Sequence, residues 1–199
     1  MKKIVLFVIL DKYSEWEAGY LAPLILALGG EKYDIKTVSL TKDPLKSLGG
    51  FTVLPDYDIQ SIPEDFAGLI LVGGMSWRKE GVEKLKPLVE KALHKKKVLG
   101  AICDASVFLG KIGVLNNIKH TSNDINDLKD WAKEEYSGEK NYLMEPAVRD
   151  NNIITANGTA SLEFAREVLL ALKVADEEKI LSWYDFYKLG CYNAPMLSI

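Results

Sequence analysis

Short runs of apolar residues alternate along the chain with stretches in which apolar side chains recur every three or four positions. Mostly apolar runs lie within residues 3–10, 68–72, 98–102 and 153–156, and residues 33–40, where polar residues are interspersed, predict a further strand. Runs of this length, bounded by Gly, Asn or charged residues, are typical of strands buried on both faces of a parallel sheet. The amphipathic stretches between them predict helices that cover both faces. The pattern therefore predicts a single α/β domain.

Helical periodicity sets the expected positions of these helices. They lie at residues 15–28, 82–95, 105–110, 126–135, 161–172 and 176–188. Thr159 or Ser161 is expected to cap the helix that ends near residue 172. Residues 44–60 contain glycines and a proline between extended runs, which predicts a hairpin or other excursion from the sheet. We expect residues 149–152 to form a turn between two short extended runs.

Composition places the chain among ordinary globular proteins. Of its 199 residues, 48% are hydrophobic and 27% are charged, and 25 Lys and Arg stand against 28 Asp and Glu for a net charge of −3. The apolar runs fall well short of the roughly 20 residues that cross a bilayer, so we expect no membrane association. A slightly acidic chain offers no electrostatic basis for binding a nucleic-acid backbone, so nucleic acid is not an expected partner.

Cysteine and histidine are scarce. Two cysteines, Cys103 and Cys191, are too few for a disulfide framework, so we expect both thiols to be free in a reducing cytoplasm. His94 and His120 are the two histidines, and with two cysteines they make no convincing set of metal ligands. The sequence also contains no glycine fingerprint for a phosphate-bearing cofactor. We therefore expect neither a metal nor a cofactor.

Cys103 occupies the most distinctive position, between a predicted buried strand and a predicted helix. Small residues surround it in residues 100–106, GAICDAS. A tight strand-to-helix turn needs small neighbours, and it exposes the side chain at the carboxyl edge of the sheet, where open α/β folds bind ligands. The positive end of the following helix is expected to lower the pKa of the thiol. A buried structural cysteine explains the same segment equally well.

Two further features lie at the same predicted edge. Gly73 and Gly74 follow the strand at 68–72, where their backbone N–H groups can approach a ligand closely and form an oxyanion hole. An ordinary strand-to-helix turn is the alternative for these glycines. Glu15 and Glu17 follow the first strand, so a carboxyl from this pair can hydrogen-bond the sulfur. Solvated acids at the start of a helix are the alternative.

In combination, these motifs resemble the PfpI-like family, related to the parkinsonism-associated protein deglycase, within the class I glutamine amidotransferase-like superfamily. The resemblance covers about residues 3–172 and depends on the ordered segments SEWE (14–17), LVGG (71–74), GAIC (100–103) and VRDNNIITA (148–156). It implies a flavodoxin-like three-layer α/β sandwich with a mostly parallel central sheet, a cysteine on a nucleophile elbow, and a homodimer. We expect residues 1–175 to form this domain and residues 176–199 to form a helical extension packed on it.

The resemblance also implies roles for individual residues. Cys103 is the expected nucleophile, and Glu17 is the expected carboxyl in contact with it, protonated beside the thiolate, with Glu15 as the alternative. The expected backbone donors are Gly73, Gly74 and Asp104. The side chains expected to line the pocket are Trp77, Asn123, Asn157 and Thr159, with packing or a dimer contact as the alternative for Trp77.

The sequence departs from the family pattern around the cysteine. Many relatives carry a histidine downstream of the cysteine, and the alignment places Asn123 there. His120 lies three residues earlier and can serve the site only if the local backbone has a different register. Asp104 stands where the family has Ala or His, and its charge opposes thiolate formation unless the side chain points away. Neither histidine belongs to the His-x-Glu pair of true glutamine amidotransferases, so glutaminase activity is disfavoured.

The resemblance therefore favours a cysteine-dependent hydrolase or lyase that acts on small reactive carbonyl or amide compounds. A stress sensor in which Cys103 is oxidised is an alternative, because oxidation needs no general base. A non-catalytic dimeric binding protein that keeps the elbow as architecture is a further alternative. The substrate, the dimer geometry and the role of the aromatic C-terminal extension are not determined by the sequence.

Overall fold

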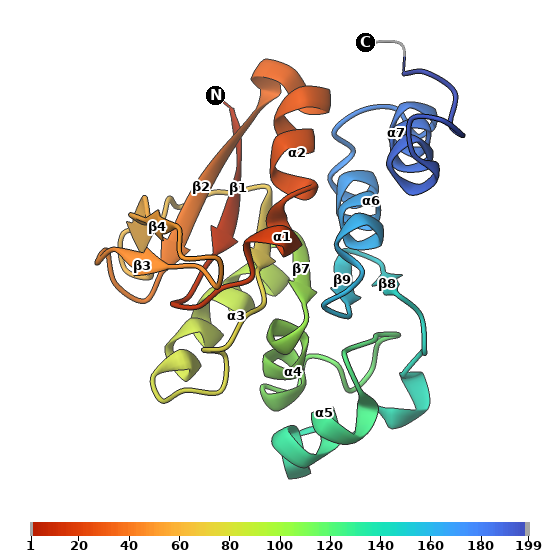
Figure 1. Cartoon of the computed structure of the whole chain (residues 1–199). Helices are drawn as coiled ribbons and strands as arrows, with labels where there is room; N and C mark the ends of the chain where they lie inside the picture. Colours follow the sequence, from red (N-terminus) through yellow and green to blue (C-terminus); the bar gives the residue numbers. More distant parts are fainter. Residues whose placement is uncertain (1, 198–199) are drawn as a thin grey trace.

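A seven-stranded sheet forms the centre of the molecule in the computed structural model, which describes residues 2–197 (Figure 1). Within this range the strand order is β5-β2-β1-β6-β7-β9-β8. The strands are Lys3–Val8 (β1), Tyr33–Ser39 (β2), Tyr57–Asp58 (β5), Gly68–Leu71 (β6), Val98–Ile102 (β7), Ala147–Asp150 (β8) and Ile153–Ala156 (β9). All neighbouring strands are parallel except β8 and β9, which are antiparallel. The expected mostly parallel sheet is confirmed.

Helices cover both faces of the sheet and produce the expected three layers (Figure 1). The helices are Glu15–Ala18 (α1), Leu21–Gly29 (α2), Lys86–His94 (α3), Asp104–Lys111 (α4), Ile125–Ala132 (α5), Ser161–Leu172 (α6) and Glu177–Leu189 (α7). Alternation along β1 assigns Val5 and Phe7 to the core under α2 and α6, and Leu6 and Val8 to the core under α3 and α4. Both faces are therefore buried, which explains the continuous apolar runs.

The predicted helix over residues 15–28 is two helices, α1 and α2, separated by Gly19 and Tyr20. Glycine is a poor helix former, and the Tyr20 ring packs edge-on against Trp183 and Tyr187 of α7. The break allows the short α1 to lie at the carboxyl edge of the sheet while α2 packs along its face. Local periodicity does not register this tertiary requirement.

The expected cap of α6 is wrong. Ala160 precedes the first turn of α6, and its side chain makes no capping hydrogen bond. The hydroxyl of Thr159 instead donates to Asn157 Oδ1 at 2.7 Å, within the preceding turn. The turn between β8 and β9 is narrower than predicted, because β8 extends to Asp150 and the turn contains Asn151 in a left-handed conformation with φ 54°.

The excursion predicted for residues 44–60 is a two-stranded antiparallel hairpin, Leu45–Lys46 (β3) and Thr52–Val53 (β4), followed by β5. The segment after β1 joins this hairpin to the loop that follows β6. Lys12 N donates to Lys46 O at 2.6 Å, and Ser14 N donates to Gly73 O at 3.0 Å. The start of α1 is thereby held beside the loop that follows β6.

The C-terminal helix α7 packs against α6. Lys188 Nζ donates to Glu163 Oε1 at 2.6 Å, and the Tyr184 hydroxyl donates to the same oxygen at 3.1 Å. Helix α7 therefore contacts the helix that covers β7 and β9. Among the described helices, none combines the length and apolar character that crossing a membrane requires.

Candidate active site

Cys103 lies on a tight turn between the end of β7 and the first residue of α4. Its backbone has φ 60° and ψ −132°, a conformation that side-chain-bearing residues rarely adopt. Cys103 N donates to Ala156 O at 2.9 Å, and Cys103 O accepts from Ser106 N at 2.9 Å, so hydrogen bonds on both sides hold the strained residue in place. The predicted elbow is confirmed, with a partly buried thiol at the carboxyl edge of the sheet.

Two glycines enclose the cysteine side chain. A Cβ added at Gly73 would lie 2.6 Å from Cys103 Cβ, and one added at Gly158 would lie 3.0 Å from Cys103 Sγ. Gly73 therefore has no room for a side chain, and at Gly158 a side chain would press against the sulfur. Gly73 was expected here, whereas Gly158 was missed, although it is adjacent to the expected Asn157.

Glu17 contacts Cys103 from α1. Its side chain is buried, and Oε2 has no well-aligned hydrogen-bond partner among the described residues. Burial raises the pKa of the Glu17 carboxyl to about 7, against the lowering effect of hydrogen bonds from Cys103, Gly73 N–H and the Ser14 hydroxyl. Of the two carboxyls considered from the sequence, it is Glu17 that contacts the thiol. Glu15 packs against Gly49 of the hairpin turn.

The environment of Cys103 does not lower the pKa of its thiol. Burial and the neighbouring Glu17 charge raise this pKa to about 11, although the Asn123 side chain and the Asp104 N–H favour the thiolate. The expected activation by the helix end is therefore outweighed in the free protein. Burial raises both pKa values and the Glu17 charge raises that of Cys103 further, so the carboxyl titrates first and the pair carries a single negative charge between about pH 7 and about pH 11.

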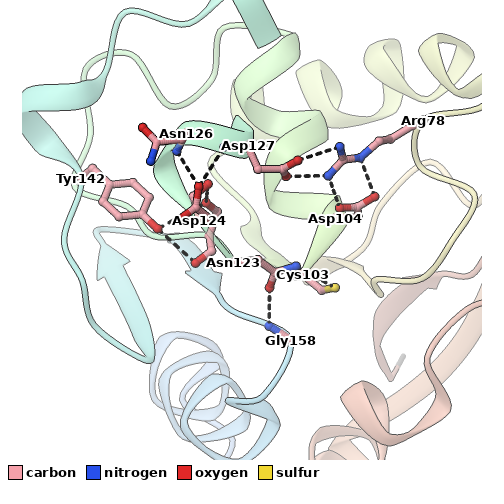
Figure 2. A network of polar contacts seen from close by, with 10 residues as sticks. Arg78, Cys103, Asp104, Asn123, Asp124, Asn126, Asp127, Tyr142 and Gly158 are labelled. Carbon is pink, nitrogen blue, oxygen red and sulfur yellow. Dashed lines mark hydrogen bonds and ion pairs between the residues drawn. The ribbon is translucent and has the colours of Figure 1, made fainter. Parts of the chain in front are cut away.

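Asn123 lies directly against the thiol, in the loop that precedes α5 (Figure 2). Its Nδ2 donates to Cys103 Sγ at 3.3 Å, and its Oδ1 accepts from Gly158 N at 2.8 Å. The side-chain amide therefore joins the cysteine to the glycine that faces it. Asn123 was expected to line the pocket, and its side chain lies at the thiol.

His120 is fully buried away from the thiol. Its Nδ1 lies 2.8 Å from Ile118 O and its Nε2 lies 2.7 Å from the Tyr136 hydroxyl, while its ring packs edge-on against Tyr136 and Tyr142. Burial lowers the pKa of the imidazole. Both ring nitrogens are engaged elsewhere, so the expectation that His120 serves as a catalytic group is wrong for this conformation.

Three residues expected to line the pocket have other roles. Trp77 is buried in the core, where Nε1 donates to Val72 O at 2.7 Å and the ring packs against Phe108. Asn157 Oδ1 accepts from Thr159 N at 3.0 Å and from its hydroxyl. Asn157 and Thr159 therefore close the turn that presents Gly158, with their polar atoms bonded to each other.

The expected backbone donors are divided between two acceptors. The Asp104 N–H favours the Cys103 thiolate, and the Gly73 N–H favours the Glu17 carboxylate. Gly74 has φ 144° and packs against the backbone of Lys12 and Tyr13. A left-handed backbone with this close approach requires glycine at position 74.

The Asp104 carboxylate points to Arg78, which the sequence analysis missed (Figure 2). Arg78 Nε and Nη2 donate to Asp104 at 2.8 and 2.7 Å, and Nη1 and Nη2 donate to Asp127 of α5 at 2.9 and 2.6 Å. Since Asp104 still raises the pKa of Cys103, the ion pair reduces its opposition to the thiolate without removing it. Across residues 2–197, no cluster of three or more His, Cys, Asp or Glu could hold a metal ion.

A doubly covered parallel sheet with a cysteine on a strained strand-to-helix turn and a buried carboxyl beside the thiol defines a nucleophile-elbow α/β protein. Sequence comparison matches residues 2–171 to the DJ-1/PfpI family, and the chain belongs to this family.

Relatives of known sequence or structure extend over nearly the whole chain. The chain is 39% identical over 194 residues to "Uncharacterized protease YdeA" of Bacillus subtilis (strain 168), with 97% of this chain and 94% of that protein covered. A DJ-1 superfamily protein from Agrobacterium tumefaciens superposes with a TM-score of 0.84 at 30% identity, covering 94% of this chain and 97% of that one. A thiJ/pfpI family protein from Bacillus anthracis superposes with a TM-score of 0.82 at 34% identity, covering 94% of this chain and 91% of that one.

Proposed function

We propose that the protein is a cysteine-dependent hydrolase or lyase for small reactive carbonyl or amide compounds, with Cys103 as nucleophile and Glu17 as acid and base. The observation that carries this proposal is the contact between the strained, partly buried Cys103 thiol and the buried Glu17 carboxyl. A carboxyl whose pKa is raised to about 7 is suited to both accepting and returning a proton near neutral pH. Two relatives from Bacillus subtilis are named "Uncharacterized protease".

For a 2-oxoaldehyde, the first step is addition of the thiol to the aldehyde carbon. The Glu17 carboxylate accepts the thiol proton as the carbon–sulfur bond forms, and the carbonyl electron pair moves onto oxygen. The Asp104 N–H, which faces the sulfur, stabilises the alkoxide together with the Asn123 amide. Glu17 then returns its proton to this oxygen, which gives a hemithioacetal.

A proton transfer completes the redox-neutral rearrangement. Glu17 removes the proton from the former aldehyde carbon and delivers it to the neighbouring carbonyl carbon through the enediol. The hydroxyl proton passes from the first oxygen to the second, so a thioester of a 2-hydroxy acid remains on Cys103. Water then cleaves the carbon–sulfur bond, releasing the 2-hydroxy acid and restoring the thiol. The sum of the steps is addition of one water to the 2-oxoaldehyde, with no external oxidant or reductant.

The position of His120 limits the range of substrates. An amide leaving group must be protonated as it departs, and with the imidazole bonded to Ile118 and Tyr136, Glu17 is the one acid in contact with the thiol among the described residues. The Asn123 amide beside the thiol cannot supply that proton. Addition to a reactive carbonyl expels no such group and demands less of this single carboxyl. We therefore favour substrates with a reactive carbonyl over peptides.

The test is turnover of methylglyoxal, measured as the 2-hydroxy acid formed by wild type, Cys103→Ser, Glu17→Gln and Cys191→Ser. We expect turnover by wild type and by Cys191→Ser, because Cys191 is exposed and lies in the C-terminal segment. We expect loss of turnover in the other two variants. Equal product from wild type and Cys103→Ser, or absence of turnover on methylglyoxal and on small activated esters and amides, would contradict the proposal.

A second candidate function is a sensor in which Cys103 is oxidised by peroxide. The thiolate attacks one peroxide oxygen, water leaves, and a second equivalent converts the sulfenic acid to a sulfinic acid. The absence of a base other than Glu17 in contact with the thiol among the described residues favours this candidate, and the donors Asn123 and Asp104 N–H suit a sulfinate. Intact-protein mass spectrometry after limited peroxide tests it: a gain of two oxygens on Cys103 before any on Cys191 supports it, and equal oxidation contradicts it.

A further inference from the structure

Three of the segments around Cys103 meet at one arginine, Arg78: the loop after β6, the elbow itself and the start of α5. Arg78 belongs to the loop that begins with Gly73 and Gly74. Its guanidinium is bonded through two nitrogens to Asp104, the residue after the nucleophile. It is bonded through two nitrogens to Asp127, in the first turn of α5. The glycine loop, the elbow and α5 therefore meet at one side chain, as Figure 2 shows for the last two.

The contact with α5 extends to the residue that touches the sulfur. Asp124 caps α5, and its Oδ1 accepts hydrogen bonds from Asn126 N at 2.8 Å and Asp127 N at 2.9 Å. Asn123, which donates to Cys103 Sγ, immediately precedes this cap. Because the cap ties the start of α5 to Asp127, a shift of Asp127 relative to Arg78 also shifts Asn123.

The geometry around Arg78 is that of a fixed anchor. Five N–H donors in one plane match two carboxylates simultaneously, and the guanidinium also lies over the Trp131 ring, 5.3 Å from its centroid. The Asp104 and Arg78 side chains are only partly exposed, at 18% and 31%. A lysine at position 78 could keep the charge but could not make both forked contacts.

We propose that Arg78 is a positioning residue that holds the glycine loop, the elbow and the Asn123 loop in register around Cys103 and offsets the charge of Asp104 beside the nucleophile. This role concerns the same cysteine as the proposed function. The structural role of Arg78 does not depend on that function, whereas its use in catalysis does. The test measures the reactivity of the thiol directly, so it can fail or succeed independently of any substrate.

The charge of Arg78 and its anchoring of α5 are expected to affect variants differently. Asp104 raises the pKa of Cys103 even with Arg78 present, so removing the cation strengthens this effect. Arg78→Gln is expected to slow alkylation of Cys103 at pH 8 about tenfold, with the pH profile displaced to higher pH. The alkylation rate of Arg78→Lys is expected to lie between those of Arg78→Gln and wild type. Asp104→Asn is expected to react roughly threefold faster than wild type.

The double variant Arg78→Gln/Asp104→Asn separates the two contributions. With both charges removed, the pH profile is expected to return to lower pH, while a slower maximal rate remains because α5 has lost its anchor. Arg166→Gln is the matched control. Arg166 lies on α6, where it is likewise paired with a carboxylate, Glu167, and lies over an aromatic ring, that of Tyr184. Its alkylation profile is expected to match wild type.

The experiment is iodoacetamide alkylation of Cys103 in a Cys191→Ser background, followed by mass spectrometry from pH 6 to pH 11, with circular dichroism to verify folding. Profiles of Arg78→Gln and Arg166→Gln that both superimpose on wild type would overturn the proposal. A double variant that keeps the displaced profile of Arg78→Gln would also overturn it, because the charge of Asp104 would then be irrelevant. If Arg78→Gln does not fold, Arg78→Lys and Asp104→Asn still decide the outcome.

Discussion

The side-chain amide of Asn123 donates a hydrogen bond of 3.3 Å to the sulfur of Cys103. An amide does not titrate, so a group in this position stabilises the thiolate without contributing a proton of its own. The pH dependence of the site therefore belongs to Cys103 and to Glu17. The donor of this hydrogen bond, which orients the sulfur, is therefore distinct from the carboxyl that is proposed to move the proton.

Replacing Asn123 tests the contribution of this hydrogen bond. The hydrogen bond from Asn123 to Sγ lowers the pKa of Cys103 in the native protein. Asn123→Ala removes this donor, so alkylation at pH 8 is expected to slow about threefold to tenfold. Asn126→Ala is the matched control, because Asn126 lies on the same segment and bonds Asp124 through its backbone. Equal rates in Asn123→Ala and Asn126→Ala would show that the amide is not a functional donor.

Replacing Glu17 changes how stability depends on pH. The folded-state pKa of Glu17 is raised to about 7, so the folded protein binds a proton that the unfolded chain releases above its ordinary pKa near 4.5. Stability from this group is therefore lost as pH rises from about 4.5 to about 7. Glu17→Gln is expected to be more stable relative to wild type at pH 8 than at pH 4.5, by up to about 3 kcal/mol.

Urea unfolding of both proteins at the two pH values measures this difference. Glu31→Gln, which removes an exposed carboxyl, is the matched control. A constant difference between Glu17→Gln and wild type would mean that Glu17 keeps an ordinary carboxyl pKa.

Gly158 is expected to control access to the thiol. In Gly158→Ala the added Cβ lies 3.0 Å from Cys103 Sγ and 3.2 Å from Glu17 Oε1, closer than van der Waals contact. Alkylation of Cys103 is expected to slow at least several-fold, while the exposed Cys191 in the same sample reacts at its wild-type rate. Unchanged reactivity of both cysteines would show that the turn opens easily.

His120 is expected to act on stability and not on thiol chemistry. His120→Gln and Tyr136→Phe each disrupt the 2.7 Å contact between Nε2 and the Tyr136 hydroxyl in a buried cluster. Each is expected to lower the free energy of unfolding by about 1–3 kcal/mol. The pH profile of Cys103 alkylation is expected to remain that of wild type. A profile that loses a step near neutral pH in His120→Gln alone would restore His120 as an acid or base.

The sequence alone was sufficient to determine the sheet, the two helical layers and the elbow. The central strands β6 and β7 are buried on both faces, so their apolar runs are continuous, and the small residues around Cys103 are required by the turn itself. These features are local or depend on chain order, and residue type and spacing report them directly. Asn123 was expected in the pocket from the family resemblance, and the folded chain brings its amide to Cys103 Sγ.

Only the tertiary structure decided which distant side chains meet at the cysteine. Glu15 and Glu17 are two residues apart, and the break at Gly19 and the packing of α1 direct Glu17 to the thiol while Glu15 faces the hairpin. Long-range contacts likewise bury His120 among tyrosines and bring Arg78 to Asp104 and Asp127. The sign of the change in the thiol pKa depended on burial and on the neighbouring carboxyl, and both quantities exist only once the chain has folded.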